Sequence, residues 1–201
     1  MGIFGRDDKD VRVKPAVPVK PIQQKPIQAP PKNNPQSLSN LIKLYDTLKK
    51  EKNVDRIIAL LTPIRDEIVG RSRGGKMLSP KDKAVEVKKQ IGYIYKMIAQ
   101  LINALNKFEE QANYNAFADN AKKTAFLGEI SKTKASLGKA IKQLGEAEKA
   151  LNPIADGTLA VNKIPANFTK CDTVIVKVTQ LIQTEIKAEN RLEHMGTLLG
   201  I

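Results

Sequence analysis

The stretch that decides the fold runs from Pro80 to Glu110 and reads PKDKAVEVKKQIGYIYKMIAQLINALNKFEE. Its apolar residues are separated alternately by three and four positions, which places them on one side of a helix. This apolar seam consists of Ala84, Val87, Ile91, Ile94, Ile98, Leu101, Leu105 and Phe108. Ser79 is suited to cap this helix and Pro80 to occupy its first position. We therefore predict one helix about 45 Å long, at about 1.5 Å per residue.

Two later segments repeat the pattern and predict two more long helices. The seam of the first is Leu127, Ile130, Lys134, Leu137, Ile141, Leu144, Glu148 and Leu151. The seam of the second, in a helix beginning at about Asn167, is Val174, Val178, Leu181, Glu185, Ala188, Leu192, Met195 and Leu199. We expect an all-α fold in which residues 80–201 form an antiparallel bundle of three long helices with coiled-coil-like seams.

Small residues lie beside the seam of the middle helix. They are Gly128, Ser131, Ala135, Gly138 and Gly145. Each glycine lowers helix stability by about 1 kcal/mol relative to alanine. We expect these positions to let a neighbouring helix come close.

Two charged residues, Lys134 and Glu185, fall inside the predicted seams. If their helices run antiparallel around the connection 152–165, Lys134 faces position 183, about half a turn from Glu185. An opposite charge at the same depth offsets much of the cost of burial. We predict a Lys134–Glu185 pair that fixes the helix register; the alternative is that both side chains extend to the surface.

Residues 37–70 predict a short helical hairpin. The first arm places Leu38, Leu41, Ile42, Tyr45 and Leu48 on one face. The second arm repeats the helical spacing, with Pro63 expected to kink it and Gly70 to end it. Together with the bundle, this hairpin makes a single helical domain over residues 37–201.

Residues 1–36 contain seven prolines, at positions 15, 18, 21, 26, 30, 31 and 35. Prolines at this density prevent a helix or a central strand. We predict a disordered, basic, Pro-rich arm. It is a spacer, or else its segment RVKPAVP from Arg12 is a ligand for proline-recognising domains.

The octet GRSRGGKM, from Gly70 to Met77, resembles the phosphate-binding loop of nucleotide-binding enzymes. In that loop a Ser or Thr follows the lysine and binds magnesium, whereas a methionine follows Lys76 here. Predicted helices also stand on both sides, where the motif requires a strand before it. We therefore interpret residues 71–79 as a basic Gly-rich loop. The candidate anion-binding residues are Arg71, Arg73 and Lys76 of the loop, with Lys49, Lys50 and Lys52 of the hairpin.

The net charge is +13, and residues 153–201 contribute none of this excess. A basic excess of this size indicates an anionic partner, either nucleic acid or membrane lipid, or serves only solubility. Aromatic residues are 4% of the chain, too few to interleave with the basic clusters and stack bases. Attraction to phosphate without sequence reading is the form of nucleic-acid binding that this composition allows.

Residues that carry catalysis are scarce. His194 is the single histidine and falls outside the seam, so we expect it to be exposed; Cys171 is the single cysteine, and we expect a structural thiol. No Glu-x-x-His pair is present, which excludes the carboxylate-bridged metal chemistry of some bundles. We predict no enzyme activity, no metal and no cofactor.

The longest uncharged apolar stretch, MIAQLINALN from Met97, is about half of a membrane span, and no signal peptide is recognisable, so we predict a cytoplasmic protein.

The opening MGIFGR and the basic helical segment from Pro80 to Leu151 resemble the ESCRT-III family of membrane-remodelling filament proteins. Chains of that family are of similar length and often begin with a small-apolar-Phe-Gly-basic peptide. The resemblance implies association with a membrane surface, in which Ile3 and Phe4 insert while Lys and Arg meet anionic lipid. The Pro-rich arm, the additional hairpin and the neutral C-terminal part depart from the family pattern.

The last helix carries a second part of this resemblance. Glu189, Leu192 and Leu199 stand where the family's ATPase-binding helix has an acidic residue and leucines. Met195 and Gly196 replace its Arg-Leu pair. This departure puts the ATPase-binding role in doubt for this chain.

These features together predict a non-enzymatic helical protein for binding or assembly. Its basic N-terminal half and flexible arm are expected to engage an anionic partner or another protein, self-assembly included. One alternative is membrane-surface association or remodelling, and a second is non-specific nucleic-acid binding as an accessory protein. We expect no small-molecule substrate.

Overall fold

The computed structural model of the chain describes residues 35–50, 53–70, 78–114, 117 and 119–201. Within these ranges the chain forms packed helices and no strand, so the predicted all-α class is confirmed. The helices are α1 (Pro35–Lys50), α2 (Asn53–Ile68), α3 (Pro80–Tyr114), α4 (Asn120–Ala155), α5 (Ile164–Ile182) and α6 (Arg191–Leu199). A 3₁₀ turn at Val161–Lys163 precedes α5, and a π-helical segment at Gln183–Lys187 follows it. The predicted Pro-rich arm lies outside the described residues, except that positions 35 and 36 already belong to α1.

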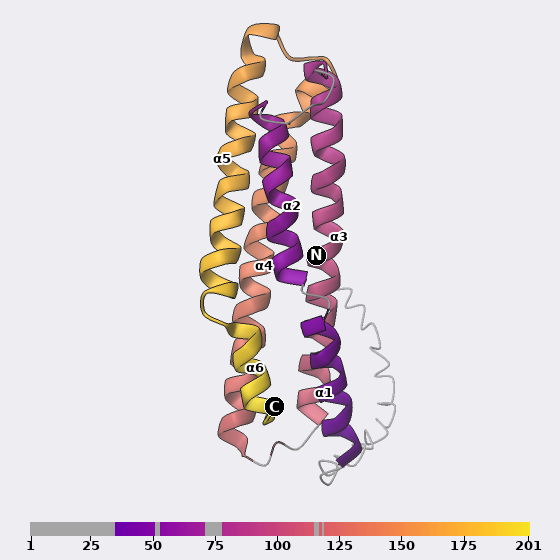
Figure 1. Cartoon of the computed structure of the whole chain (residues 1–201), viewed down its shortest axis with the longest axis vertical. Helices are drawn as coiled ribbons and strands as arrows, with labels where there is room; N and C mark the ends of the chain where they lie inside the picture. Colours follow the sequence, from indigo (N-terminus) through magenta and orange to yellow (C-terminus); the bar gives the residue numbers. More distant parts are fainter. Residues whose placement is uncertain (1–34, 51–52, 71–77, 115–116, 118) are drawn as a thin grey trace, which may run out of the picture.

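Two helices, α3 and α4, run the length of the molecule and pack against each other (Figure 1). One half of this pair is covered by α2 and α5, and the other half by α1 and α6 (Figure 1). The α1–α2 junction and the α5–α6 junction (residues 183–190) therefore lie at about the same level. An ion pair between Lys187 Nζ and Asp55 Oδ1, at 2.7 Å, joins the two junctions.

The predicted helical hairpin over residues 37–70 is wrong in its geometry. Rather than folding back on each other, α1 and α2 follow one another along α3 (Figure 1). Each buries its own apolar face against the bundle, α1 through Leu41 and Tyr45 and α2 through Ile57 and Leu61. The apolar faces thus have better partners in the long helices than in each other.

The start and the seam of α3 agree with the sequence pattern. Ser79 Oγ accepts a hydrogen bond from the Asp82 amide at 3.1 Å and donates one to its carboxylate at 2.6 Å, a capping arrangement. All eight predicted seam residues of α3 are buried. Gly70 ends α2 with a φ of +74°, the left-handed conformation expected of a glycine at this position.

The seam predicted for α4 is right only in part. Four of its residues are fully buried, namely Ile130, Leu137, Leu144 and Leu151, and the other four are partly exposed, namely Leu127, Lys134, Ile141 and Glu148. The remainder of the buried face consists largely of small residues, namely Thr133, Ser136, Ala140, Ala147 and Ala150. Because α4 packs against α3 on one side and against α5 on the other, its buried face is wider than one heptad seam.

The last helix is interrupted, which contradicts the prediction of one helix to Leu199. The buried face of α5 is formed by Cys171, Val174, Ile175, Val178 and Ile182, of which Val174 and Val178 belong to the predicted seam. At the same spacing this face would next present Glu185 and Glu189 to the bundle, and buried carboxylates are costly.

The π-helical segment and a turn at Asn190 change the register instead. Asn190 has φ 47° and ψ 35°, in the left-handed region. After it Arg191, Met195 and Leu199 are buried. A π turn adds a residue to the helix, and the apolar face of α6 is thereby turned toward α1 and α4.

The glycines of α4 do not bring a neighbouring backbone close. A Cβ built on Gly128 or Gly138 has no atom within 4 Å, and one on Gly145 lies 3.2 Å from Tyr95 Oη. The tight contact is in α6, where a Cβ on Gly196 would lie 2.6 Å from Cζ of the buried Tyr45. The close approach made possible by a glycine therefore joins α6 to α1.

This difference predicts opposite effects for two alanine substitutions. Gly138→Ala should raise the free energy of unfolding by about 1 kcal/mol, because it improves helix propensity at an open position. Gly196→Ala should lower it by about 1–3 kcal/mol, because the methyl group overpacks against Tyr45. Urea unfolding of both variants measures this, and a Gly196→Ala protein as stable as Gly138→Ala would contradict the packing of α6 on α1.

Candidate functional site

The anion-binding residues predicted from sequence are mostly outside the described part of the chain. Arg71, Arg73, Lys76 and Lys52 lie outside the described residues, as does the side chain of Lys50. Lys49 is exposed on α1, with Nζ 6.0 Å from the centroid of the Tyr45 ring. The structure thus places one member of the predicted set.

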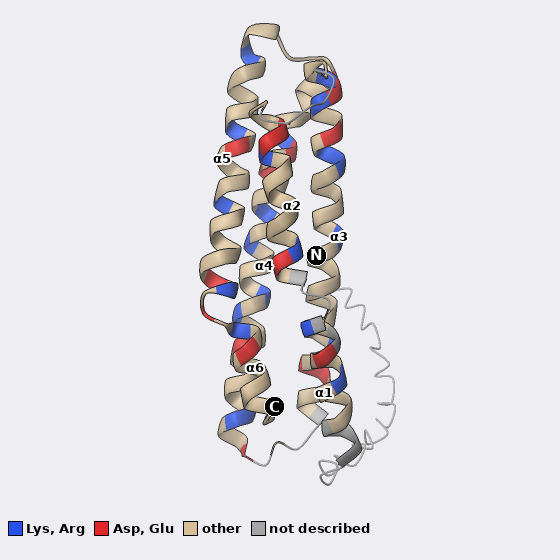
Figure 2. Cartoon of the chain, viewed as in Figure 1, with Lys and Arg blue, Asp and Glu red and all other residues tan. Residues whose placement is uncertain are grey.

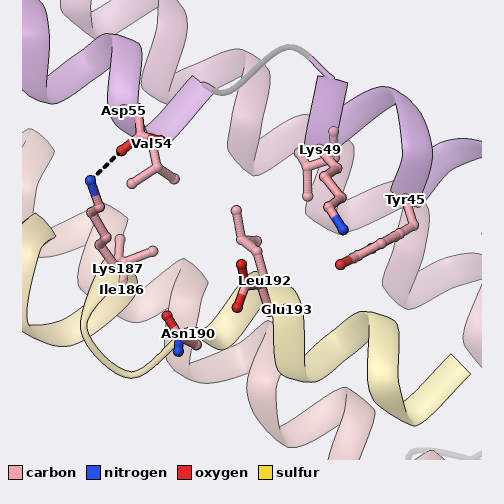
Figure 3. Close-up of a pocket in the computed structure, with 10 residues that line it drawn as sticks. Tyr45, Lys49, Val54, Asp55, Ile186, Lys187, Asn190, Leu192 and Glu193 are labelled. Atoms are coloured by element: carbon pink, nitrogen blue, oxygen red, sulfur yellow. Dashed lines mark ion pairs between the residues drawn. The ribbon is translucent and has the colours of Figure 1, made fainter. Parts of the chain in front are cut away.

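Lys49 lines a cavity of about 270 Å³ between the two junctions (Figure 3). Its floor is apolar, with Leu48, Val54, Ile186 and Leu192. Its charged lining is of both signs: Lys49 and Lys187 face Asp55 and Glu193 (Figure 3). Because the carboxylates repel an anion, this cavity does not suit the anionic ligand that the sequence predicts.

A second cavity, of about 620 Å³, lies between α2 and α3. It is lined by Leu60, Pro63, Ile64, Glu86, Lys89, Gln90, Gly92, Tyr93 and Lys96. Tyr93 is exposed and accepts a hydrogen bond from Arg56 at 2.9 Å. Its charged lining is Glu86, Lys89 and Lys96, and Lys89 Nζ lies 3.9 Å from Glu86 Oε2.

A regularly spaced set of lysines lies on α4 and α5. Five exposed lysines there form no ion pair or hydrogen bond with any described residue: Lys142, Lys149, Lys163, Lys170 and Lys177, which we call the lysine face. Lys142 and Lys149 are seven residues apart on α4. Lys163, on the 3₁₀ turn, and Lys170 and Lys177, on α5, are also spaced seven residues apart. A seven-residue interval keeps side chains on one side of a helix, at steps of about 10 Å. Figure 2 shows Lys and Arg at successive levels of α5.

The two rows of lysines meet at a groove between α4 and α5. Lys149 and Lys170 both line it, with Glu146, Asn167 and Val174, around a volume of about 320 Å³. Asn167 Nδ2 donates to the carbonyl of Ala150 at 2.9 Å and so fixes the helices next to each other. The one acidic residue of α5, Asp172, is paired with Arg65 of α2 at 2.9 Å. The groove therefore has two unpaired ammonium groups against one carboxylate.

Sequence reasoning missed the lysine face because it summed charge over segments. Residues 153–201 are neutral as a whole, because five acidic residues balance their five basic ones, and three of the acidic residues, Glu185, Glu189 and Glu193, belong to the α5–α6 junction and α6. Figure 2 shows the acidic and basic residues along these helices. The signal was the repetition of lysine at positions 163, 170 and 177. A search for like charges at heptad intervals finds it.

The most buried ion pair among the described residues lies beside the α5–α6 junction and joins α6 to α4. Arg191 is 9% exposed and its Nη1 lies 3.0 Å from Oε2 of Glu129, which is 12% exposed on α4. Arg191 also donates from Nε to the carbonyl of Glu185 and pairs with the carboxylate of Glu189. Burial alone would raise the pKa of Glu129, but hydrogen bonds from Arg191 and Lys132 outweigh it and lower that pKa below its ordinary value of 4.5.

The predicted Lys134–Glu185 pair is wrong. Lys134 Nζ instead lies 2.7 Å from Glu109 Oε2 of α3, because Lys134 is on the flank of α4 that faces α3. Glu185 accepts from Ser136 Oγ at 2.6 Å and pairs with Lys139 Nζ at 3.3 Å. The hydrogen bond from Ser136, followed by the contacts of Lys139, lowers the pKa of Glu185. Glu185 thus does meet α4, but nearer the α4–α5 connection than predicted.

The remaining reactive groups are placed unfavourably for chemistry. Cys171 is fully buried, and burial, helped by the charge of Asp172, raises the pKa of its thiol to about 12. His194 is exposed, as predicted, with Nδ1 3.9 Å from Glu129 Oε1. Among the described residues no group of His, Cys, Asp and Glu side chains is arranged to hold a metal ion. In the same part of the chain, no helix has the length and apolar character required to cross a membrane.

Comparisons with protein-family models, with curated proteins and with solved structures found no match to this chain. The lysine face and the α5–α6 junction are therefore interpreted from their own geometry.

The lowered pKa of Glu129 predicts a stability loss in acid. A carboxyl group whose pKa is lower in the folded state stabilises the fold above its unfolded pKa, and this stabilisation is lost as the pH falls through the folded value. The free energy of unfolding should therefore fall below about pH 4.5. Glu129→Gln should be less stable than the natural protein at pH 7, and the difference should narrow as the pH is lowered.

Chemical denaturation between pH 7 and pH 3 measures this. Glu110→Gln, at an exposed position of α3, is the matched control and should follow the natural protein throughout. If the difference in the free energy of unfolding between Glu129→Gln and the natural protein stays constant in acid, the charged contact of Glu129 with Arg191 is contradicted.

Proposed function

We propose that the protein is a non-enzymatic binding component that engages an extended anionic partner through the lysine face. The observation that carries this proposal is the lysine face, five exposed lysines in two neighbouring rows that have no partners among the described residues. Keeping like charges close together is unfavourable, so an unpaired row needs a compensating anion or remains fully solvated. A partner with repeated negative charges along its length matches the regular steps of the row.

Further positive charge supports this proposal. The arm and the Gly-rich loop contribute Arg71, Arg73 and Lys76 and the basic residues of positions 1–34. In this proposal the helical face positions the partner, and these segments add attraction that depends on salt. Phosphate groups are the recognised chemistry, because the lysine face carries no aromatic side chain that would stack on a base.

The fully buried Cys171 and exposed His194 support a binding role over a catalytic one. A thiol with a pKa of about 12 stays protonated at neutral pH and is a poor nucleophile. The proposed activity is therefore retention of a polyanion, with no bond formed or broken.

Neutralising the lysine face tests the proposal. The variant changes Lys142, Lys149, Lys163, Lys170 and Lys177 to Gln. Its binding to heparin and to duplex nucleic acid is measured over a range of salt concentrations, against the natural chain. The slope of log affinity against log salt should become shallower by up to about 0.9 for each lysine that contacts a phosphate.

The matched control neutralises five exposed lysines elsewhere, namely Lys81, Lys89, Lys96, Lys107 and Lys122. It changes the net charge equally and should leave most of the affinity and the slope in place. Equal losses of affinity in both variants would show attraction to net charge alone and would contradict the lysine face as the site.

A third variant, with Arg71, Arg73 and Lys76 changed to Gln, measures the contribution of the loop. Vesicles of anionic lipid, run in parallel, separate binding to a membrane surface from binding to nucleic acid.

A further inference from the structure

The interruption between α5 and α6 has one weak cause in the local sequence, Asn190, which accepts the left-handed conformation more readily than most residues but does not require it. Residues 166–195 contain neither proline nor glycine, and the junction itself reads QTEIKAEN. Glutamine, glutamate, lysine and alanine all favour helix. Taken alone, the junction therefore permits a continuous helix.

The junction also holds backbone conformations that cost free energy. It combines the π-helical segment with the left-handed conformation of Asn190, the one non-glycine residue with positive φ among those described. No side-chain hydrogen bond caps α6 at Asn190. Contacts made by α6 with the rest of the bundle must therefore hold the junction in place.

Those contacts form a seat for α6 on α1 and α4. Arg191 lies 3.0 Å from Glu129 of α4. Gly196 packs against the ring of Tyr45 of α1 so closely that a methyl group does not fit. Met195 and Leu199 are buried in the same seat. The seat is complementary to α6 itself, in both shape and charge.

A straight helix does not fit within the same copy of the bundle. Continued from Ile182, the buried face of α5 would turn Glu185 and Glu189 toward the core. The π-helical segment is therefore kept. If Asn190 becomes helical, the chain after it changes direction and α6 leaves its own seat, so that Tyr45 and Glu129 are uncovered.

We propose that two copies of this chain exchange α6. In the exchanged dimer the π-helical segment is kept, residues 188–190 become helical, and the α6 of one copy occupies the seat formed by α1 and α4 of the other. The contacts of Arg191 with Glu129 and of Gly196 with Tyr45 are then made between copies. Exchange keeps every contact of the seat and relieves the strained junction, which is the general basis of domain swapping.

The partner is a second copy because the seat is built for α6. The cavity between the two junctions leaves space beside Asn190 and Leu192, where the junction lies (Figure 3). The ion pair of Lys187 with Asp55 lies before Asn190 in the chain and stays within each copy. The hinge is therefore confined to the residues from Ala188 to Asn190.

Two substitutions of Asn190 test the exchange, because they move the hinge in opposite directions. Asn190→Ala disfavours the left-handed conformation and favours helix, so it should strengthen the dimer. Asn190→Gly accepts the left-handed conformation and disfavours helix, so it should strengthen the monomer. Asn190 is exposed and caps nothing, so both variants remove the same side chain without disturbing the core.

Sedimentation equilibrium of the full chain over a range of concentrations gives the dissociation constant. Monomer is 22.2 kDa, and the dimer is twice that mass. The dimer dissociation constant of Asn190→Ala should be at least about tenfold lower than that of Asn190→Gly, with the natural chain between them. Equal constants for the two variants, or an Asn190→Ala protein that stays monomeric at every concentration, would overturn the proposal.

An isotope-filtered NMR experiment distinguishes exchange from any other dimer. Differently labelled copies of Asn190→Ala are unfolded together, refolded and examined for contacts between the Tyr45 ring and the Gly196 Hα protons. A contact between copies is expected if α6 is exchanged. A dimer in which this contact occurs solely within each copy would also overturn the proposal.

Discussion

The pairing of Arg191 with Glu129 is the interaction on which the architecture of the C-terminal part depends. A guanidinium group taken out of water needs a carboxylate and further acceptors, and this one has Glu129, Glu189 and the carbonyl of Glu185. That carbonyl belongs to the turn where the helix is interrupted. Arg191 thus satisfies an acceptor that the interruption would otherwise leave without a partner, and it fixes α6 on α4 at the same time. The level of this junction coincides with that of the α1–α2 junction, so α1 and α6 together cover one half of the long pair α3 and α4 (Figure 1).

The distribution of charge divides the molecule in a similar way. Glu185 and Glu189 lie in the α5–α6 junction, where Lys139 pairs with the first and Arg191 with the second, and Lys187 of the same junction pairs with Asp55 of α2. The lysines of the α4–α5 surface toward the other end have no such partners among the described residues. Charges that hold the fold together are consequently separate from charges that are free to meet a partner. Neutralising the lysine face should accordingly leave the packing of α6 unaffected.

Periodicity in the sequence predicted the helices whose buried face is made of large apolar residues. The seam of α3 and its capping residues Ser79 and Pro80 were found in this way. Periodicity failed for α4, because half of its buried face consists of residues such as Thr133 and Ala140 that a search for large apolar residues passes over. The Lys134–Glu185 pair failed for the same reason, since Lys134 is on the α3 side of α4.

The interruption between α5 and α6 could not be predicted from the local sequence, for a different reason. Residues 183–190 contain neither proline nor glycine, and Asn190 accepts the left-handed conformation without requiring it, so the interruption depends on the register in which α5 packs. The lysine face could have been found, since its members repeat at heptad intervals, but summing charge by segment concealed it. Propensity and composition are local or averaged quantities, whereas register and partner choice are decided by packing between distant segments.

A double-mutant cycle on Arg191→Met and Glu129→Met measures the central interaction most directly. If the pair is buried and supports the junction, each single substitution should lower the free energy of unfolding by about 3–5 kcal/mol, because it leaves the other charge without its partner. The double substitution should then cost much less than the sum of the two. Losses below about 0.5 kcal/mol for each single change, adding together in the double, would place both groups in water and contradict this account.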